Sequence, residues 1–132
     1  MRIAPLLILA AFLTAHGLIH LSFLAPPPPR TADGPEWPFE LGRSWLIGRV
    51  DLDPGVLRLV GAALVEATVA SFSAAALATI GWLAPSWWAG LVAAGASSSL
   101  ITLALFFRPW LVLGIAIDVT LLWVVLATGW SP

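Results

Sequence analysis

Four ionisable side chains lie inside long apolar stretches of the sequence: His16, His20, Glu66 and Asp118. An ionisable side chain in lipid is costly, and membrane proteins keep one where it forms a site or pairs with another polar group. His16 and His20 are four residues apart, so they share one face of a helix. These four residues are therefore the candidate intramembrane polar site.

Two imidazoles and two carboxylates can serve more than one kind of chemistry. They can bind a divalent metal ion, or they can relay protons, because histidine titrates near neutral pH. A third interpretation is structural: hydrogen bonds between helices fix the packing of a bundle. Each such bond stabilises a membrane bundle by on the order of 0.6 kcal/mol. The pattern itself assigns no metal ligand, no cofactor and no catalytic role.

Several other kinds of site are excluded. The HGLIH stretch, residues 16–20, lacks the glutamate that follows the first histidine in zinc proteases. Adjacent turns of one helix cannot reach both faces of a haem, and the absence of cysteine excludes thiolate chemistry and disulfides. The net charge of −1 and the lack of a basic run argue against nucleic-acid binding.

Composition indicates what positions these side chains. The chain is 60% hydrophobic and 10% charged, whereas soluble domains are about half apolar and about a quarter charged. A helix crosses a bilayer with about 20 apolar residues, and four runs are long enough: 3–24, 56–83, 87–107 and 110–129. We therefore expect an all-α integral membrane four-helix bundle, a single domain over residues 1–132.

The first run resembles a signal peptide in its position, but we expect it to be retained. It is longer than a usual signal-peptide core, and no clear small-x-small cleavage site precedes the proline run. Pro85 and Pro109 mark tight breaks between the later spans. The spans therefore run up and down with short connections.

The one sizeable loop covers residues 25–55. Its PPPP run is a stiff spacer. Residues 37–48 mix aromatic and charged residues, which favours either an amphipathic segment lying at the membrane interface or an ordered cap over the end of the bundle. Asp53 and Pro54 are typical of a helix N-cap and first helical position.

Depth places the four ionisable side chains together. At ~1.5 Å per residue, all of them lie on the loop side of the middle of their spans. Gly17 lies beside the two histidines, and Gly114 lies one turn before Asp118, so both allow a neighbouring helix to come close. We expect His16, Glu66 and Asp118 to face one interior pocket.

Small residues recur every four positions in the second and third spans. Such stripes permit close backbone approach between membrane helices, so we expect these two spans to pack along them. The stripes are Ala63, Ala67, Ser71, Ala75 and Thr79 in one span, and Gly90, Ala94, Ser98 and Thr102 in the other.

Aromatic and basic residues indicate the topology. Tryptophan gathers at membrane interfaces, and positive charge on the cytoplasmic side. Five of the six arginines lie on the loop side, so we expect a cytoplasmic loop and external termini; the arginines of that side are Arg30, Arg43, Arg49, Arg58 and Arg108. Two tryptophan belts are expected, with Trp82, Trp87, Trp88 and Trp130 at the end that holds the termini and Trp37, Trp45 and Trp110 at the loop end.

The motifs resemble a known group. HGLIHL in the first span, VLRLVGAAL with Arg58 and Gly61 at the start of the second, and GIAID from Gly114 to Asp118 are similar to small four-span bacterial membrane proteins of unestablished activity. That group has Asn where this chain has Asp118. A weaker likeness, in span count alone, is to DoxX-like membrane proteins. The resemblance implies the fold and the site and no activity.

We therefore expect a multi-pass protein of a bacterial inner membrane. The favoured function is a non-enzymatic membrane component whose polar cluster binds a small ligand or proton, or fixes the bundle. One alternative is a membrane enzyme or redox subunit acting on a lipophilic substrate such as a quinone. Another is a scaffold or accessory subunit whose partners are membrane proteins or further copies of this chain.

Overall fold

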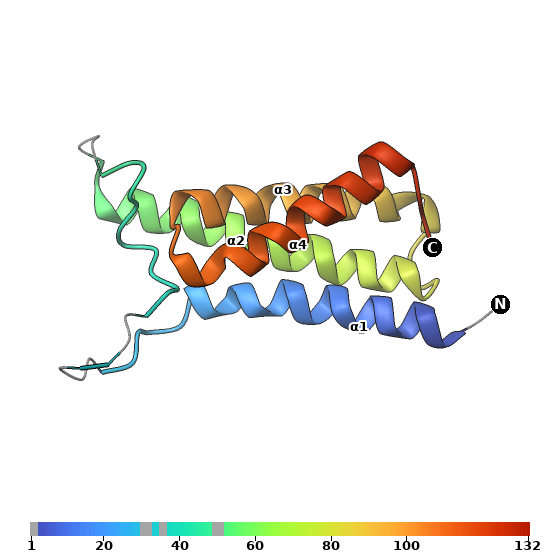
Figure 1. Ribbon diagram of the computed structural model, residues 1–132, viewed down its shortest axis with the longest axis horizontal. Helices are drawn as coiled ribbons and strands as arrows, with labels where there is room; N and C mark the ends of the chain where they lie inside the picture. The colour runs from blue at the N-terminus through green and yellow to red at the C-terminus, as the bar shows by residue number, and fades with distance from the viewer. Residues whose placement is uncertain (1–2, 30–32, 35–36, 49–51) are drawn as a thin grey trace.

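The structure is a computed structural model that describes residues 3–29, 33–34, 37–48 and 52–132. In these ranges all regular structure is helical, in four long helices that run along one axis (Figure 1). The bounds are α1 Ile3–Ile19 with a 3-10 turn η1 His20–Phe23, α2 Pro54–Thr79, η2 Pro85–Trp87 leading into α3 Trp88–Leu105, and η3 Pro109–Leu111 leading into α4 Val112–Trp123, which a π-helical turn η4 Val124–Thr128 extends.

Each of the four helical segments is long and apolar enough to cross a membrane. These segments are Ile3–Phe23, Pro54–Thr79, Pro85–Leu105 and Pro109–Thr128. They match the four predicted spans to within a few residues. Both termini and the α2–α3 connection lie at one end, and the loop and the α3–α4 connection lie at the other (Figure 1).

The helix starts follow local chemistry. The side chain of Asp53 accepts hydrogen bonds from the backbone N–H groups of Gly55 and Val56, at 2.7 and 3.2 Å, and Pro54 is the first helical residue. The predicted N-cap is therefore confirmed. Pro85 and Pro109 begin the short 3-10 turns, where a missing N–H costs nothing because the first N–H groups of a helix have no partner.

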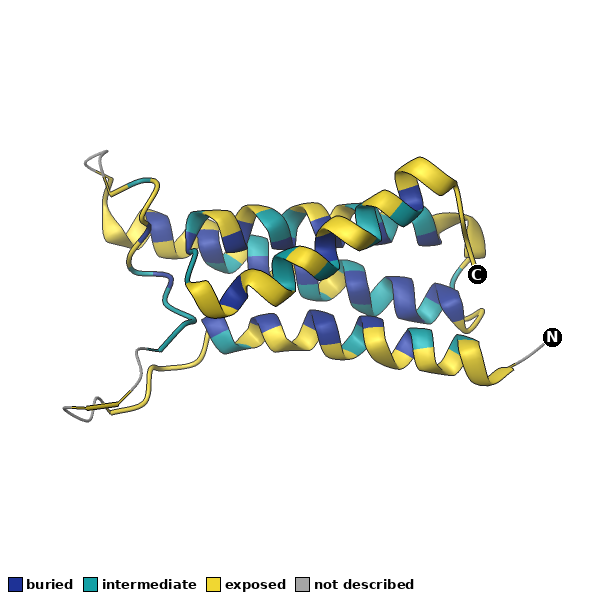
Figure 2. Cartoon of the chain, in the orientation of Figure 1, coloured by how far each residue is buried: buried dark blue, intermediate teal, exposed yellow. Residues whose placement is uncertain are grey.

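The helices do not all pack equally. α2 packs against both α1 and α3, and α4 packs against α3, whereas α1 and α4 make few contacts in the described chain. α4 crosses the bundle diagonally, so its loop end lies near α1 and its other end lies over α3 (Figure 1). Buried residues line the inward sides of all four helices (Figure 2). The α1–α4 side is therefore the loosest side of the bundle.

Phe72 holds three helices together. It is 0% exposed on α2, and both α1 and α3 approach it with a glycine. A Cβ on Gly17 would lie 3.0 Å from the Cβ of Phe72, and a Cβ on Gly95 would lie 3.2 Å from the ring. The role predicted for Gly17 is thus confirmed, and the same close approach recurs at Gly95 on α3.

The two small-residue stripes do not form the α2–α3 contact along their length. Ala63, Ala67, Gly90 and Ala94 are exposed. Only the ends of the stripes are buried, as at Thr79, whose hydroxyl accepts a hydrogen bond from the indole of buried Trp88 at 3.0 Å. The prediction is therefore wrong for most of the stripe, because α2 and α3 meet through larger side chains seated against Gly95.

The loop segment 37–48 contains turns and no helix. The hydroxyl of Ser44 donates to the carbonyl oxygen of Leu105 at 2.5 Å, and the indole of Trp45 donates to that of Ala104 at 2.7 Å. The last carbonyl groups of a helix lack partners within the helix. The loop therefore caps the C-terminal end of α3.

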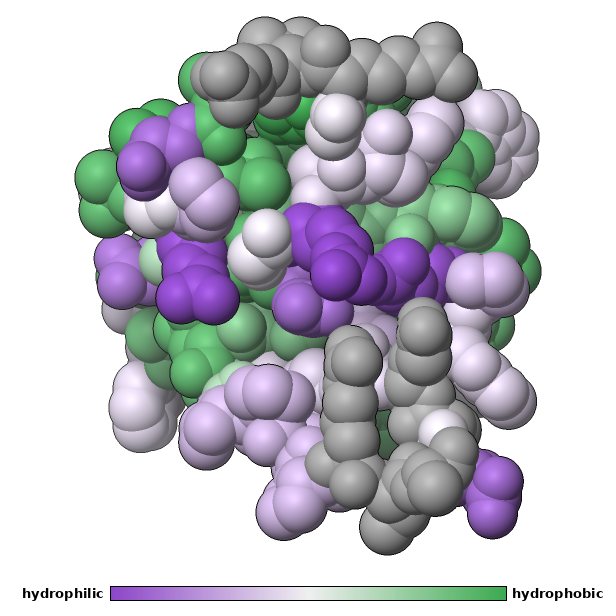
Figure 3. All heavy atoms as spheres, turned by 90° about the vertical axis from the view of Figure 1, so that its left-hand side faces the viewer, coloured by the Kyte–Doolittle hydropathy of each residue, from purple (hydrophilic) through white to green (hydrophobic). Residues whose placement is uncertain are grey.

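A buried leucine fixes the same segment from the other side. Leu41 is 8% exposed and packs in the core of the loop end with Phe106. A Cβ on Gly61 of α2 would lie 2.7 Å from its Cδ2. Of the two interpretations of this segment, the contacts support the ordered cap. Hydrophilic residues gather at the centre of this end, with apolar residues around them (Figure 3).

The tryptophan prediction holds for most positions. Trp82, Trp87 and Trp130 are exposed at one end, and Trp45 and Trp110 at the other. Trp88 is an exception, because it is 1% exposed in the core. The remaining parts of the loop and orientation predictions, which involve residues 30–32, 35–36 and 49–51 and Arg2, lie outside the described residues.

Candidate functional site

The first contact of the predicted site joins α1 to α4. Nε2 of His16 lies 2.8 Å from Oδ1 of Asp118. Asp118 is 0% exposed and His16 is 7% exposed. A carboxylate in such a position needs hydrogen-bond donors, and His16 supplies one of them.

The second donor is a residue that the sequence did not reveal. The hydroxyl of Ser99, on α3, donates to Oδ2 of Asp118. Oγ of Ser99 also lies 2.7 Å from Nε2 of His20. Ser99 is 0% exposed, so this hydroxyl links Asp118 to the second histidine.

Ser99 was missed because serine carries no charge and lies in a run of three, residues 97–99. The predicted stripe passed through Ser98 instead. One signal was present: Ser99 follows Gly95 by four residues, so the two share a helix face, and Gly95 marks the side of α3 that approaches α2.

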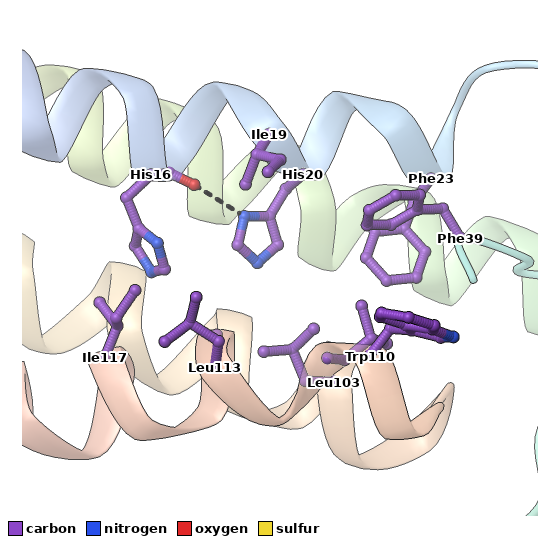
Figure 4. Close-up of a pocket in the computed structure, with 11 residues that line it drawn as sticks. His16, Ile19, His20, Phe23, Phe39, Leu103, Trp110, Leu113 and Ile117 are labelled. Carbon is purple, nitrogen blue, oxygen red and sulfur yellow. Dashed lines mark hydrogen bonds between the residues drawn. The ribbon is translucent and has the colours of Figure 1, made fainter.

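His20 is held at both ring nitrogens. α1 ends at Ile19, and the ring of His20, in the 3-10 turn that follows, turns back along the helix. Its Nδ1 lies 3.0 Å from the carbonyl oxygen of His16, as the dashed line in Figure 4 marks. A carbonyl oxygen can only accept, so Nδ1 of His20 carries a proton.

Aromatic rings fix the orientation of His16. Phe12 stacks on the imidazole with a centroid distance of 5.9 Å, and Phe72 contacts it edge-on at 5.1 Å. The ring of His20 meets it in a T-shaped arrangement at 5.6 Å. His16 is thus held by the same Phe72 that joins α1, α2 and α3.

A cavity of about 160 Å³ opens beside the two histidines, on the loose side between α1 and α4. In Figure 4 the imidazoles of His16, on α1, and His20, on η1, point across this space toward the side chains below. The lining is almost entirely apolar: His16, Ile19, His20, Phe23, Phe39, Leu103, Trp110, Leu111, Leu113, Gly114 and Ile117.

One ring nitrogen of the cluster, on a side chain that lines this cavity, makes no hydrogen bond to a described residue. Nε2 of His16 is bound to Asp118, and Nδ1 has no hydrogen-bond partner among the described residues. In that part of the chain, Nε1 of Trp37 is the one fully buried side-chain nitrogen or oxygen without a partner. Nδ1 of His16 therefore keeps accessible surface, and both nitrogens of His20 are already used.

Glu66 does not belong to the cluster. It is exposed on α2 and makes no hydrogen bond or ion pair with another described residue. The expectation that it faces the interior with His16 and Asp118 is wrong. The side of α2 that faces the bundle carries Val65, Thr68 and Phe72, which are 0% exposed, and Glu66 lies on another side of the helix.

Of the four residues of the predicted site, the structure brings His16, His20 and Asp118 together through Ser99 and leaves Glu66 outside. The polar atoms of this cluster form a chain of hydrogen bonds. Among the residues that the structure describes, no three His, Asp or Glu side chains converge on a point that could hold a metal ion. Such a chain can hold, orient and pass protons.

In comparison with known proteins, no family model matches the chain, and no curated protein and no solved structure matches it. The resemblance based on the HGLIHL motif stays a prediction.

Proposed function

We propose that the chain is a multi-pass protein of a bacterial inner membrane and that its pocket binds a small lipophilic molecule carrying a hydroxyl group. Membrane insertion is supported by the four apolar helices and by their outer surfaces. Leu59 is 72% exposed and Leu126 is 73% exposed. Lipid covers such side chains at no hydrophobic cost, whereas water contact costs about 25 cal/mol per Å².

The open nitrogen of His16 carries the proposal for the ligand. The cavity is small and apolar, and such cavities favour apolar molecules over water. Within it, Nδ1 of His16 is an acceptor while Nε2 shares a proton with Asp118. A ligand that donates one hydrogen bond, such as an alcohol or phenol with an apolar body, matches both features.

The position of the pocket suits a ligand that arrives through the membrane. α1 and α4 make few contacts, and the lining side chain of Leu113 is 69% exposed on the outside of the bundle. A lipid-soluble molecule can therefore enter from the side. In the proposed role the protein binds the ligand and accepts a proton from it, and it does not convert the ligand into a product.

A binding comparison tests this proposal. The purified protein in lipid nanodiscs is titrated with para-cresol and with toluene, which lacks the hydroxyl. We expect saturable binding of both, with para-cresol about two- to tenfold tighter, since a net hydrogen bond contributes about 0.5–1.5 kcal/mol.

Two variants locate the binding. Ile117→Trp adds bulk to the cavity lining and should weaken binding of both compounds. Val119→Trp, on an exposed position of the same helix, is the matched control and should leave it unchanged. Equal affinity for the two compounds, or equal behaviour of the two variants, would refute the assignment.

The enzyme alternative uses the same pocket. A quinol is a lipophilic molecule with hydroxyl groups, and a histidine held by a carboxylate is a suitable general base for its proton. The enzyme alternative predicts that the bound quinol is oxidised when an electron acceptor is added, whereas the binding protein predicts no oxidation. Binding without oxidation favours the binding protein.

The scaffold alternative is supported by a different surface. Glu66 is exposed within the α2 segment, next to exposed Ala63, Ala67 and Ala70. A carboxyl group facing lipid is costly, and small neighbours let a second helix approach. A membrane protein partner or a further copy of this chain would cover it.

A further inference from the structure

Four side chains beside the pocket form one continuous series of hydrogen bonds. His16 contacts Asp118, Asp118 contacts Ser99, Ser99 contacts His20, and His20 contacts the backbone carbonyl of His16. All four residues are at most 7% exposed. Two acceptors facing each other in a buried contact repel, so each contact must contain one proton.

This requirement fixes the number of protons. Four contacts need four protons, which equals the number in the neutral forms of the two histidines, the serine and the carboxylic acid together. The cluster is therefore neutral as a whole. Neutrality agrees with its burial, because an uncompensated charge there would be costly.

Four protons can be arranged in two ways that satisfy every contact. In the first, Asp118 is protonated and donates to Ser99, and Ser99 donates to Nε2 of His20. In the second, His20 carries protons on both nitrogens and donates to Ser99, and Ser99 donates to the Asp118 carboxylate. The two arrangements differ by the transfer of a proton between Asp118 and His20 through the Ser99 hydroxyl, which donates to one of them at a time.

A fifth proton can bind Nδ1 of His16, the ring nitrogen of the cluster that makes no hydrogen bond to a described residue, on a side chain that lines the pocket. When it binds there, the Nε2 proton of His16 can pass to Oδ1 of Asp118. The contact with Asp118 then still holds one proton, now donated by the carboxyl group. With Ser99 donating to Oδ2 and His20 protonated at both nitrogens, every contact remains satisfied.

We propose that His16, Asp118, Ser99 and His20 form a proton relay that accepts a proton from a pocket-bound hydroxyl group and holds the resulting positive charge on His20. The ligand O–H bond breaks and the His16 Nδ1–H bond forms. From the first arrangement, the Nε2 proton of His16 passes to Oδ1 of Asp118 and the Oδ2 proton of Asp118 passes to Ser99. The Ser99 hydroxyl proton passes to Nε2 of His20, so that each bond broken is matched by one formed. The ligand oxygen becomes an oxyanion that accepts a hydrogen bond from Nδ1 of His16.

The charge balance favours this end state. The ligand carries −1 and His20 carries +1, while His16 and Asp118 are neutral. The imidazole centroids of His16 and His20 are 5.6 Å apart and both rings line the pocket, so the two charges stay close. Among the residues that the structure describes, no other titratable side chain makes a hydrogen bond or ion pair with the cluster: α2 presents Phe72 to it, α3 presents Ser99, and Glu66 is exposed.

The proton source rests on the proposed function, but the relay itself is tested without any ligand. ¹⁵N-histidine NMR of the protein in nanodiscs reports which ring nitrogens carry protons. As the pH is lowered, we expect His16 to change from an Nε2–H to an Nδ1–H tautomer, and His20 to be protonated at both nitrogens. A His16 that instead becomes doubly protonated, with Nε2–H retained, would overturn the relay.

Ser99→Ala breaks the chain at its centre, and Ser97→Ala, two residues away on an exposed position, is the matched control. We expect Ser99→Ala to abolish the tautomer change at His16, because Asp118 can no longer exchange protons with His20. Ser97→Ala should behave like the wild type. The same tautomer change in Ser99→Ala as in the wild type would contradict the role of the serine.

A chromogenic probe then tests the proton source. Para-nitrophenol absorbs differently as phenol and as phenolate, so its proton transfer to the protein is visible. At a pH where the free probe is mainly phenol, we expect wild type and Ser97→Ala to hold it as phenolate. Ser99→Ala should bind it with similar affinity and hold at least several-fold less phenolate.

The outcomes separate the two proposals. Absence of saturable binding to the wild type would count against the ligand proposal, and the NMR experiment would still decide the relay. Equal phenolate in Ser99→Ala and the wild type would show that His16 and Asp118 accept the proton alone, and would refute the relay.

Discussion

At the scale of single residues, the informative feature is that Asp118 makes hydrogen bonds to two different helices, through His16 and Ser99. A carboxyl group can do this in either protonation state, because its second oxygen can accept or donate. An amide can mimic one of those states. Its oxygen can accept from His16 and its NH₂ group can donate to Ser99.

Substitutions of Asp118 can therefore distinguish its structural role from its role in proton transfer. Asp118→Asn should fold with stability close to the wild type, keep both histidines in their neutral tautomers and lose the proton shift. Asp118→Leu leaves the buried Nε2–H group of His16 without a partner, whereas Ser99 can still donate to His20, and it should lower the unfolding free energy by about 1–3 kcal/mol. Denaturant unfolding in detergent measures this, and equal stability of the two variants would mean that Asp118 is not the centre of the network.

At the scale of elements, the contact that positions the site is the meeting of α1, α2 and α3 at Phe72. Gly17 follows His16 directly, so the distance between α1 and α2 also sets the position of the imidazole. A larger side chain at residue 17 would push α1 away from α2. The site thus depends on a glycine that takes no part in its chemistry.

Gly17→Val should lower stability by about 1–3 kcal/mol, the usual cost of an overpacked contact, and weaken the His16–Asp118 hydrogen bond. Gly90→Val is the control, because a Cβ at residue 90 would have no heavy atom within 4 Å. Thermal unfolding in nanodiscs compares the two. Similar losses in both variants would show that the contact with Phe72 is not the cause, because valine favours a helix more than glycine does.

The capping loop leads to a second prediction at this scale. Trp45 is 61% exposed with its indole N–H bound to α3, whereas Trp37 is half-buried and packs edge-on against Phe39 at 5.3 Å. Tryptophan favours the headgroup region of a bilayer. In variants that retain one tryptophan, brominated lipids should quench Trp45 strongly and Trp37 less, and no quenching of either would place the loop away from the membrane.

At the scale of the whole molecule, the exposed surface of α2 is the unexplained feature. It presents Glu66 between Ala63, Ala67 and Ala70, all turned away from the bundle. If a second copy of the chain covers this face, cysteine at residue 67 should form a disulfide across the interface, since the chain has no other cysteine.

Crosslinking of Ala67→Cys in membranes tests the assembly, with Leu126→Cys on α4 as the exposed control. We expect a crosslinked dimer for Ala67→Cys and none for Leu126→Cys. Addition of Glu66→Gln should change the yield of the dimer if the carboxyl group lies in the interface. Crosslinking at neither position would favour a different membrane protein as the partner of this face.

The sequence by itself determined the helical spans, their ends and three of the four site residues. Apolar run length sets the spans, proline and Asp53 set the ends, and ionisable residues in apolar runs stand out because burial of charge is costly. Only the tertiary structure decided which of these side chains meet. Rotation of α2 about its axis turns Glu66 outward, and packing of α3 brings Ser99 between Asp118 and His20. Local pattern cannot fix these rotations, because every face of a lipid-embedded helix is apolar enough to face either the lipid or the core.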